Sequence, residues 1–267
     1  PIEFINTGEL DIKTTYVLPV TIKSVEGIGV LQSAKTYYYV FRGASLINVV
    51  CNISRNRAYP DFKNDSKFNN LTENTMEILF KANSFPNTLN TLMGIESNYL
   101  LRIGDATIPN NQLQVATSVN NCTSADLQLE SGKWYHVAVA FNKGNVKVYI
   151  NGVEKLSGST GKSSVSLGAK HTNEEDGSRC FWVGYSYKDD RYFDGVVSEV
   201  RIWNRALTAE EIQATNHFYT IEPESEGLIA YWKFDEGSGT VAKDYSVSGY
   251  DLTIEKEPKW ESVSLPQ

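Results

Sequence analysis

Residues 193–212 read FDGVVSEVRIWNRALTAEEI and decide the fold, because they combine one strand with one capped helix. Gly195 permits a tight turn before the strand. Alternation along the strand predicts two faces. One face is aliphatic and consists of Val196, Val200 and Ile202. The other face is mixed and consists of Val197, Glu199, Arg201 and Trp203. Glu199 and Arg201 are then neighbours on one face and are expected to pair. We expect this segment to build the fold rather than to carry chemistry.

The helix signal lies at the end of this stretch. Thr208 and Glu211 form a capping box, in which a hydroxyl and a carboxylate satisfy backbone amides at the helix start. Leu207 and Ile212 have the spacing of a hydrophobic staple. The pattern predicts a helix from residue 209 to about residue 216, and no other segment has an equally clear helix signal.

Strand signals dominate the sequence upstream of this stretch. Residues 134–141, WYHVAVAF, predict a strand with one apolar face, made of Tyr135, Val137, Val139 and Phe141. Residues 146–150, VKVYI, repeat the pattern, and Asn151 and Gly152 then supply the two positive φ angles of a type I′ turn. Short turns of this kind predict an antiparallel meander and exclude parallel βαβ winding, whose connections need about a dozen residues.

The composition limits the class of protein. Hydrophobic residues make up 41% of the 267 residues and charged residues 21%, which is ordinary for a globular protein. A net charge of −7 disfavours a nucleic-acid partner, because phosphate backbones require a dense basic surface. No apolar stretch approaches the ~20 residues of a transmembrane helix. One short helix among many strands predicts an all-β sandwich or jelly roll.

The chain is expected to have two parts. Residues 1–58 carry six basic and four acidic residues, whereas the remainder carries 19 basic and 28 acidic residues. Residues 52–74 are rich in Asn, Arg, Lys, Asp and Ser and poor in aliphatic residues. We therefore predict a small, truncated β-sandwich domain over residues 1–58, a linker over 59–70 and a jelly-roll domain over 71–267.

The stretch 193–212 resembles the signature of laminin-G-like, concanavalin A-like jelly-roll domains. Residues 134–137, the hairpin at 151–153 and the strand at 75–80 fit the same family, so that the resemblance covers roughly residues 70 to 260. It implies an antiparallel jelly-roll β-sandwich with one short helix. The family includes carbohydrate-binding modules, adhesion modules and glycoside hydrolases, and a shared fold does not decide between them.

One segment departs from the family pattern. Residues 228–239 and 243–252 resemble the opening strands of such domains, yet here they follow the helix. We favour a permuted strand order over the start of a second, truncated domain, because only 15 residues follow Leu252. Permutation requires Trp232 and Phe234 to lie in the core that contains Val137 and Val148.

Residues 1–58 are similar to the tail of a β-sandwich domain of unassigned function that precedes laminin-G-like domains in surface proteins of gut Gram-negative bacteria. Residues 16–22 and 37–41 carry this likeness, and Pro19 within the first of them indicates an edge strand or a bulge. The resemblance implies an exported lipoprotein at the outer-membrane surface or in the periplasm. Its signal or lipid anchor is expected to lie upstream of Pro1.

Several catalytic motifs are missing from the sequence. Laminarinase-like hydrolases use a Glu-x-Asp-x-x-Glu strand, but the nearest match, at residues 174–176, has Arg179 where the last carboxylate is needed. Residues 158–163, GSTGKS, lack the first glycine of a phosphate-binding loop. The three histidines, His136, His171 and His217, are isolated in the sequence, which makes a transition-metal site or a catalytic triad improbable. A carboxylate pair assembled by the fold remains the enzymatic alternative.

Sugar recognition requires an aromatic platform and planar polar groups that hydrogen-bond hydroxyls. One segment offers both, so we name as candidate carbohydrate-binding residues Tyr185, Tyr187, Arg191 and Tyr192. Tyr99 and Arg102 form a second candidate pair. Calcium prefers loop carboxylates, so Asp176, Asp189 and Asp190 are its candidate ligands, but a solvated acidic loop is the interpretation that we favour.

The leading functional hypothesis is a non-catalytic, cell-surface module that binds a glycan or polysaccharide. A module that binds a protein partner at the cell surface and a glycoside hydrolase on the same scaffold are the alternatives. Three cysteines are too few for a disulfide framework. Buried thiols at Cys51, Cys122 and Cys180 are expected, and a bridge between Cys122 and Cys180 is the other possibility.

Overall fold

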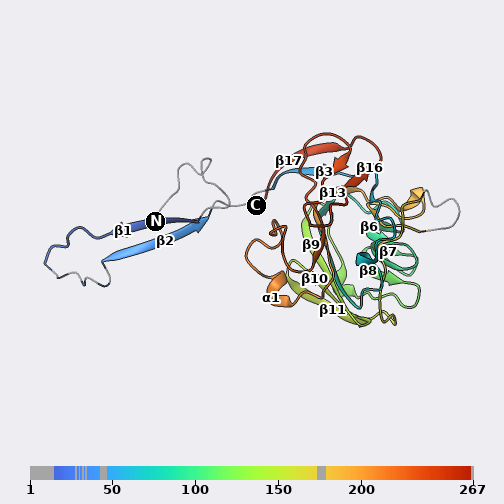
Figure 1. The fold of residues 1–267 in the computed structure, drawn as a ribbon, viewed down its shortest axis with the longest axis horizontal. Coiled ribbons are helices and arrows are strands. Elements are labelled where there is room, and N and C mark those ends of the chain that lie inside the picture. Colours follow the sequence, from blue (N-terminus) through green and yellow to red (C-terminus); the bar gives the residue numbers. More distant parts are fainter. Residues whose placement is uncertain are drawn as a thin grey trace. The chain divides into compact units, whose positions relative to one another are not determined.

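The structure is a computed structural model, which describes residues 15–42 apart from 28, 30, 32 and 34, and residues 47–172 and 179–265 (Figure 1). Its contacts divide the chain into two units, residues 1–46 and residues 47–267. No helix in the described segments is long and apolar enough to cross a membrane.

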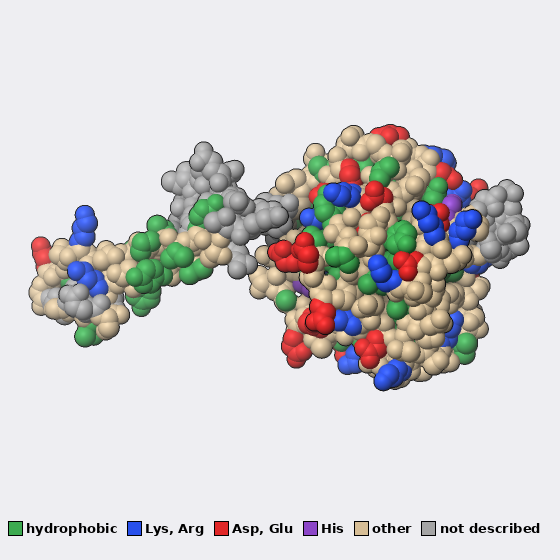
Figure 2. All heavy atoms as spheres, viewed as in Figure 1, with side chains coloured by type: hydrophobic (Ala, Val, Ile, Leu, Met, Phe, Trp, Pro, Cys, Tyr) green, Lys and Arg blue, Asp and Glu red, His purple; other side chains and the backbone are tan. Residues whose placement is uncertain are grey.

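The first unit contains an antiparallel hairpin of β1 (Thr15–Thr21) and β2 (Thr36–Arg42), in which Pro19 lies opposite Tyr38. Both strands of a two-stranded ribbon are edges, and edge strands are where proline is tolerated in a sheet. Large apolar side chains are exposed along the hairpin, among them Val17, Leu18, Val20, Tyr37, Tyr38 and Val40. Figure 2 shows hydrophobic side chains gathered on it.

The second unit is a sandwich of two antiparallel sheets. In the described segments the first sheet has the order β11-β10-β9-β5-β13-β3-β17, and β14 also pairs with β13. Its strands are β3 (Ile47–Asn52), β5 (Glu73–Ala82), β9 (Trp134–Asn142), β10 (Asn145–Ile150), β11 (Val153–Ser159), β13 (Gly195–Trp203), β14 (Leu228–Trp232) and β17 (Lys259–Leu265). The order is far from the order in sequence, as expected for a jelly roll.

The second sheet has the order β15-β16-β4-β12-β6-β7-β8 over the same described segments. Its strands are β4 (Ala58–Pro60), β6 (Asn90–Ile95), β7 (Tyr99–Asp105), β8 (Ile108–Thr117), β12 (Trp182–Val183), β15 (Val241–Ala242) and β16 (Leu252–Ile254). Short 3-10 helices lie in the connections, namely η2 (Ser66–Phe68), η3 (Ala125–Leu127) and η4 (Asp189–Arg191). The all-β antiparallel sandwich expected from the sequence is confirmed.

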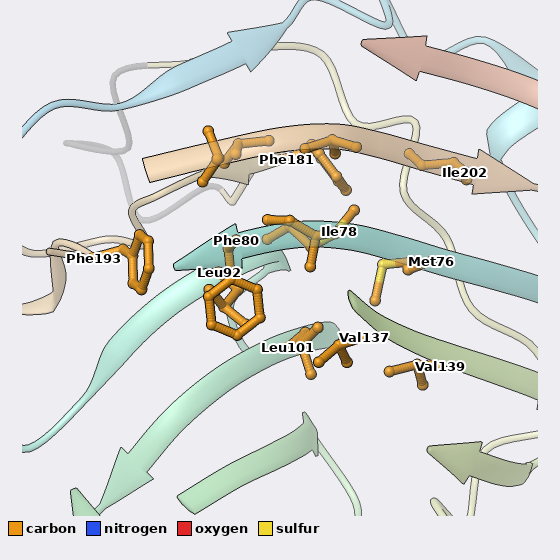
Figure 3. Packing of buried hydrophobic residues seen from close by; sticks show 14 of the residues in the cluster. Met76, Ile78, Phe80, Leu92, Leu101, Val137, Val139, Phe181, Phe193 and Ile202 are labelled. Carbon is orange, nitrogen blue, oxygen red and sulfur yellow. The ribbon is translucent and has the colours of Figure 1, made fainter. Parts of the chain in front are cut away.

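The main core lies between the two sheets (Figure 3). Met76 and Phe80 of β5 and Val137 of β9 meet Leu92 and Leu101 of the facing sheet. The alternation predicted for residues 134–150 is confirmed, since every aliphatic side chain of its apolar faces lies in this core. Full burial of such side chains contributes about 1.5–3 kcal/mol each, so this layer is a main source of stability.

The C-terminal hairpin belongs to the same sandwich. Trp232 and Phe234 are fully buried in the core that also contains Val137 and Val148, as the permuted strand order requires. β14 pairs with β13 in the first sheet, and β16 pairs with β4 in the second. The segment therefore completes the domain instead of starting another one.

The boundary between the two parts lies earlier than residue 58. β3 pairs with β13 and β17, and β4 pairs with β12 and β16, so both strands belong to the sandwich. Phe62 and Phe68 have no exposed surface and lie in the main core, so residues 59–70 are not a linker. The burial of these two aromatic side chains was missed from the sequence because most of their neighbours in the sequence are polar.

The predicted faces of β13 were wrong at one end. Val197, rather than Val196, shares the main core with Val200 and Ile202, while Val196 packs in a different cluster. The cause is Glu199, whose φ of 49° inserts one extra residue into the strand, where the pairing with β5 shifts register. Such a bulge exchanges the faces on one side of itself, which strict alternation cannot anticipate.

The capping box is confirmed: Thr208 and Glu211 exchange hydrogen bonds at the start of α1 (Ala209–Ile212). Leu207 and Ile212 share a buried cluster. The helix ends four residues before the predicted end: Gln213 is its C-cap, and Asn216 has a φ of 66°, through which an α-helix cannot continue. The three cysteines are buried thiols, and no disulfide joins Cys122 to Cys180.

Candidate functional site

The loop that leads from β12 into β13 contains most of the predicted sugar-binding residues. Tyr185 is only 6% exposed, because it packs edge-on against Trp182 with ring centroids 5.1 Å apart. The Arg57 guanidinium lies 4.4 Å above the Tyr185 ring and 4.8 Å above the Trp182 ring. Tyr185 is therefore part of the packing, and the prediction that it offers a platform to a sugar is wrong.

Tyr187 lies at the turn of this loop, half-buried and with a φ of 63°. Two guanidiniums lie near its ring, that of Arg179 at 4.2 Å and that of Arg191 at 5.0 Å from the centroid. Arg191 also forms an ion pair of 3.0 Å with Glu96. A sugar could stack on Tyr187 only by competing with these cation–π contacts.

Tyr192 opens onto a hollow with a volume of about 740 Å³. We call this hollow the rim cleft, and four loops line it. They contribute Ser54 and Arg55 after β3, Ser84, Pro86 and Asn87 after β5, Asp189, Tyr192, Phe193 and Asp194 before β13, and Lys256 after β16. A volume of this size accommodates a small organic ligand or a few sugar units.

A smaller hollow of about 270 Å³ lies next to the rim cleft and shares Pro86 and Asn87 with it. Asp190 and Arg191 line this second hollow. The 3-10 helix η4 therefore sends Asp189 into one hollow and Asp190 and Arg191 into the other. The predicted segment lies between two neighbouring depressions of one surface.

Hydrogen bonds fasten the loops around the rim cleft. The Asp194 carboxylate accepts hydrogen bonds from Ser84 Oγ at 2.5 Å, from Ser54 Oγ at 2.8 Å and from Asn83 Nδ2 at 3.3 Å. Burial acts to raise the pKa of Asp194, but these hydrogen bonds outweigh it and hold the pKa below its usual range. Asn87 Nδ2 also donates to the Tyr192 carbonyl at 3.0 Å. Three loops are thus joined through two side chains.

The second predicted pair does not form a site. Tyr99 has no exposed surface and packs edge-on against Phe141 in the main core, with centroids 5.7 Å apart. Arg102 is 8% exposed, and its guanidinium donates to Gln114 at 2.8 Å and to Asp105 at 2.5 Å. This prediction was wrong because alternation places Tyr99 inward, where no ligand reaches it.

The predicted calcium ligands are not gathered at one point. Asp189 and Asp190 are exposed on η4 and face different hollows, and Asp176 lies outside the described residues. In the described part of the chain, the one group of three side chains with metal-ligand spacing is Glu77, His136 and His217. The histidines that look isolated in the sequence thus meet in space, apart from His171, which stacks on Tyr59.

Comparison with known proteins shows the family to which the chain belongs. Residues 56–213 match the family described as the concanavalin A-like lectin/glucanases superfamily. The chain belongs to this superfamily. No curated protein sequence matches it.

Two solved structures are similar to this chain. A candidate carbohydrate-binding protein from Bacteroides ovatus is 27% identical with a TM-score of 0.74, over 95% of this chain and 70% of that one. Domain 4 of AbnA, an extracellular arabinanase from Geobacillus stearothermophilus solved with arabinotriose, is 20% identical with a TM-score of 0.47, over 78% of this chain and 89% of that one.

Of the ten residues that line the rim cleft, only Asp189 and Tyr192 were named in the sequence analysis. Ser54, Ser84 and Lys256 come from loops far apart in the sequence. Polar residues in loops are common, and nothing local distinguishes these from any others. One signal was available: the aromatic-Phe-Asp-Gly run at residues 192–195 fixes where β13 begins, and the cleft lies around that point.

Proposed function

We propose that this domain is a non-catalytic carbohydrate-binding module and that a glycan occupies the rim cleft. The observation that carries the proposal is the assembly, from four loops, of an accessible tyrosine with polar side chains of both charge signs around a hollow of about 740 Å³. The superfamily contains lectins, and the similar Bacteroides ovatus structure is described as a candidate carbohydrate-binding protein. Both support this choice.

The chemistry of the rim cleft fits a sugar. The half-buried ring of Tyr192 and the exposed ring of Pro86 offer apolar surface to the C–H face of a pyranose. Asn87, Arg55 and Asp189 supply amide, guanidinium and carboxylate groups for its hydroxyls. We expect Asp194 to stabilise the loops that form the cleft and not to bind the ligand, because its oxygens already accept hydrogen bonds from neighbouring loops.

The carboxylates of Asp189 and Asp194 raise the question of whether the rim cleft could catalyse hydrolysis. Asp189 and Asp194 both line the rim cleft, and a glycoside hydrolase needs such a pair. A hydrolase also needs a general acid whose pKa is raised, whereas the pKa of Asp194 is lowered by its hydrogen bonds, which outweigh the effect of burial. Asp194 therefore does not fit the role of the general acid, and hydrolysis is an outcome that the glycan experiment distinguishes.

A protein-binding role is the second candidate, and the hairpin of the first unit favours it. Tyr37 and Tyr38 are 67% and 66% exposed, next to exposed valines on both strands. Exposed apolar surface of this kind is typical of protein interfaces. By contrast, the exposed valines described in the second unit lie on separate turns and strands, namely Val119, Val153, Val241 and Val247.

A glycan array followed by calorimetric titration tests the proposal. We expect the full chain to bind at least one plant, microbial or mucosal glycan, and the Tyr192→Ala variant to lose about tenfold or more in affinity, the usual effect of truncating an aromatic anchor. Tyr37→Ala, which removes an exposed tyrosine in the other unit, is the matched control and should bind normally. Release of reducing sugar would indicate a hydrolase. Binding that is insensitive to Tyr192→Ala would refute the proposed site.

Two further proposals depend on the sequence alone, one on its family resemblance and one on its loop carboxylates. We propose that the protein is exported to the cell surface or the periplasm, which cell fractionation of the native organism tests. We also propose that calcium at Asp189 or Asp190 assists binding, in which case chelation should weaken the affinity for the glycan. An affinity that is unchanged by chelation would remove calcium from the account.

A further inference from the structure

A second buried cluster lies on the outer face of the first sheet, away from the main core. Trp203, Leu207, Ile212 and Tyr231 pack there, so that α1 and the segment after it cover the sheet. Polar side chains lie beside this apolar cluster. Glu77 of β5 is completely buried, His136 of β9 is 1% exposed and His217, from the turns after α1, is 5% exposed.

These three side chains converge on one carboxylate oxygen. His217 Nε2 lies 2.6 Å from Glu77 Oε1, and His136 Nε2 lies 3.4 Å from the same atom. One ligand atom from each of the three lies within 4.8 Å of the others. Two imidazoles and one carboxylate at this spacing form a donor set that zinc and related divalent ions bind.

The other oxygen of the carboxylate is held in place by its neighbours. Trp203 Nε1 donates a hydrogen bond of 2.6 Å to Glu77 Oε2, and the Arg201 guanidinium lies 3.7 Å from the same oxygen. Outer partners of this kind orient a ligating carboxylate. Glu77 Oε1 is thus the oxygen that faces the two histidines.

His136 provides a second, independent observation. Neither of its ring nitrogens has a hydrogen-bond partner, although the side chain is almost completely buried. The ring stacks on Phe218 with centroids 4.5 Å apart, which fixes its orientation. A buried imidazole without a partner is unfavourable unless a ligand completes it. The Nε2 atom points to Glu77 at 3.4 Å, where such a ligand would lie.

The charge balance of the cluster allows a cation. Arg201 pairs with Glu199, which also accepts a hydrogen bond of 2.6 Å from the Tyr231 hydroxyl. Glu77 then remains as a carboxylate in excess of the buried positive charge.

We propose that Glu77, His136 and His217 form a buried binding site for a divalent transition metal, with zinc as the best match to two imidazoles and one carboxylate. The metal would connect two strands of the sheet with the segment that covers them. Its role would be structural, and the site involves none of the residues that line the rim cleft. The rival explanation is a metal-free network in which a proton on His217 balances Glu77.

Metal analysis of the full chain tests this site. Protein from zinc-supplemented cells, and protein refolded with zinc, should retain stoichiometric zinc after extensive dialysis, measured by mass spectrometry of the metal. His136→Gln and His217→Gln should each lose most of it. His171→Gln is the matched control, because His171 stacks on Tyr59 away from Glu77, and it should retain the metal.

A measurement on the unaltered protein guards against variants that fail to fold. Refolding with Co²⁺ should produce the visible absorption bands of a four-coordinate cobalt site, and added zinc should abolish them. Absence of both bound zinc and the cobalt bands in folded wild-type protein would overturn the proposal and support the metal-free network. Equal loss of zinc in His171→Gln and His217→Gln would overturn it as well.

Discussion

The indole Nε1 of Trp203 donates a hydrogen bond of 2.6 Å to the buried carboxylate of Glu77, joining β13 to β5 on the outer face of the first sheet. Trp203→Phe keeps most of the apolar volume but removes this donor. We expect a loss of about 1–3 kcal/mol in the free energy of unfolding, because a buried carboxylate oxygen loses its partner. Urea denaturation measures this loss.

Trp182→Phe is the matched control for that substitution. Both tryptophans are 2% exposed and lie under a guanidinium, that of Arg205 for Trp203 and that of Arg57 for Trp182. The Nε1 of Trp182, however, has no hydrogen-bond partner. The same change in volume should therefore cost less at this position. Equal losses in the two variants would contradict the role assigned to the hydrogen bond between Trp203 and Glu77.

Asp194 should make stability depend on pH at the acid end. Its pKa is lower in the folded protein than in the unfolded chain, because hydrogen bonds from Ser84, Ser54 and Asn83 outweigh burial. The stabilisation is fully present above the unfolded pKa of about 3.9 and is lost as the pH falls through the folded value. Asp194→Asn should therefore show a shallower loss of stability on acidification than wild type, as measured by urea midpoints. Parallel curves would refute this explanation.

The capping box should contribute measurably despite the shortness of α1. Thr208→Ala removes the hydroxyl that accepts a hydrogen bond from the Glu211 backbone amide. The expected loss is about 1 kcal/mol in the free energy of unfolding. Thr208→Ser keeps the hydroxyl and should stay within a few tenths of a kcal/mol of wild type, on the order of ordinary cap exchanges. Similar losses in both variants would point to packing of the threonine methyl group instead.

Phe62 should be as important as any residue of the central strands. It has no exposed surface and stacks on Phe68 with ring centroids 3.9 Å apart. Phe62→Ala should cost about 3–5 kcal/mol, the usual cost of emptying an aromatic position in a core. Lys67→Ala, at a neighbouring exposed position, should change stability by no more than about 0.5 kcal/mol. A small effect of Phe62→Ala would restore the idea of a linker over residues 59–70.

Much of the fold could be predicted because local rules agreed with it. Alternation in β9 and β10, the turn at Asn151 and Gly152 and the capping box at Thr208 all have one physical solution each. The errors arose at positions where contacts between distant parts of the chain determine the local structure. The bulge at Glu199 is stabilised by its contact with Arg201 and Tyr231, and the place of Phe62 in the core depends on strands that are distant in sequence.

The candidate site could be predicted only in part. The segment around Tyr192 was identifiable because aromatic and charged residues alternate there, but alternation alone could not separate Tyr192 from the packed Tyr185. The difference comes from Arg57, which precedes β4, and from Trp182 of β12, because both cover the Tyr185 ring. The partners of Tyr192 across the cleft come from loops that only the closed sandwich brings together.

The most direct measurement is an NMR map of backbone amide shifts during titration with a glycan selected from the array. The account predicts that the largest shifts gather around the rim cleft, at Asn87, Tyr192 and Lys256, and that Tyr192→Ala abolishes them. Shifts that gather instead on the hairpin of β1 and β2, or on the outer face beside α1, would contradict the account. So would the absence of shifts with every glycan that the array returns.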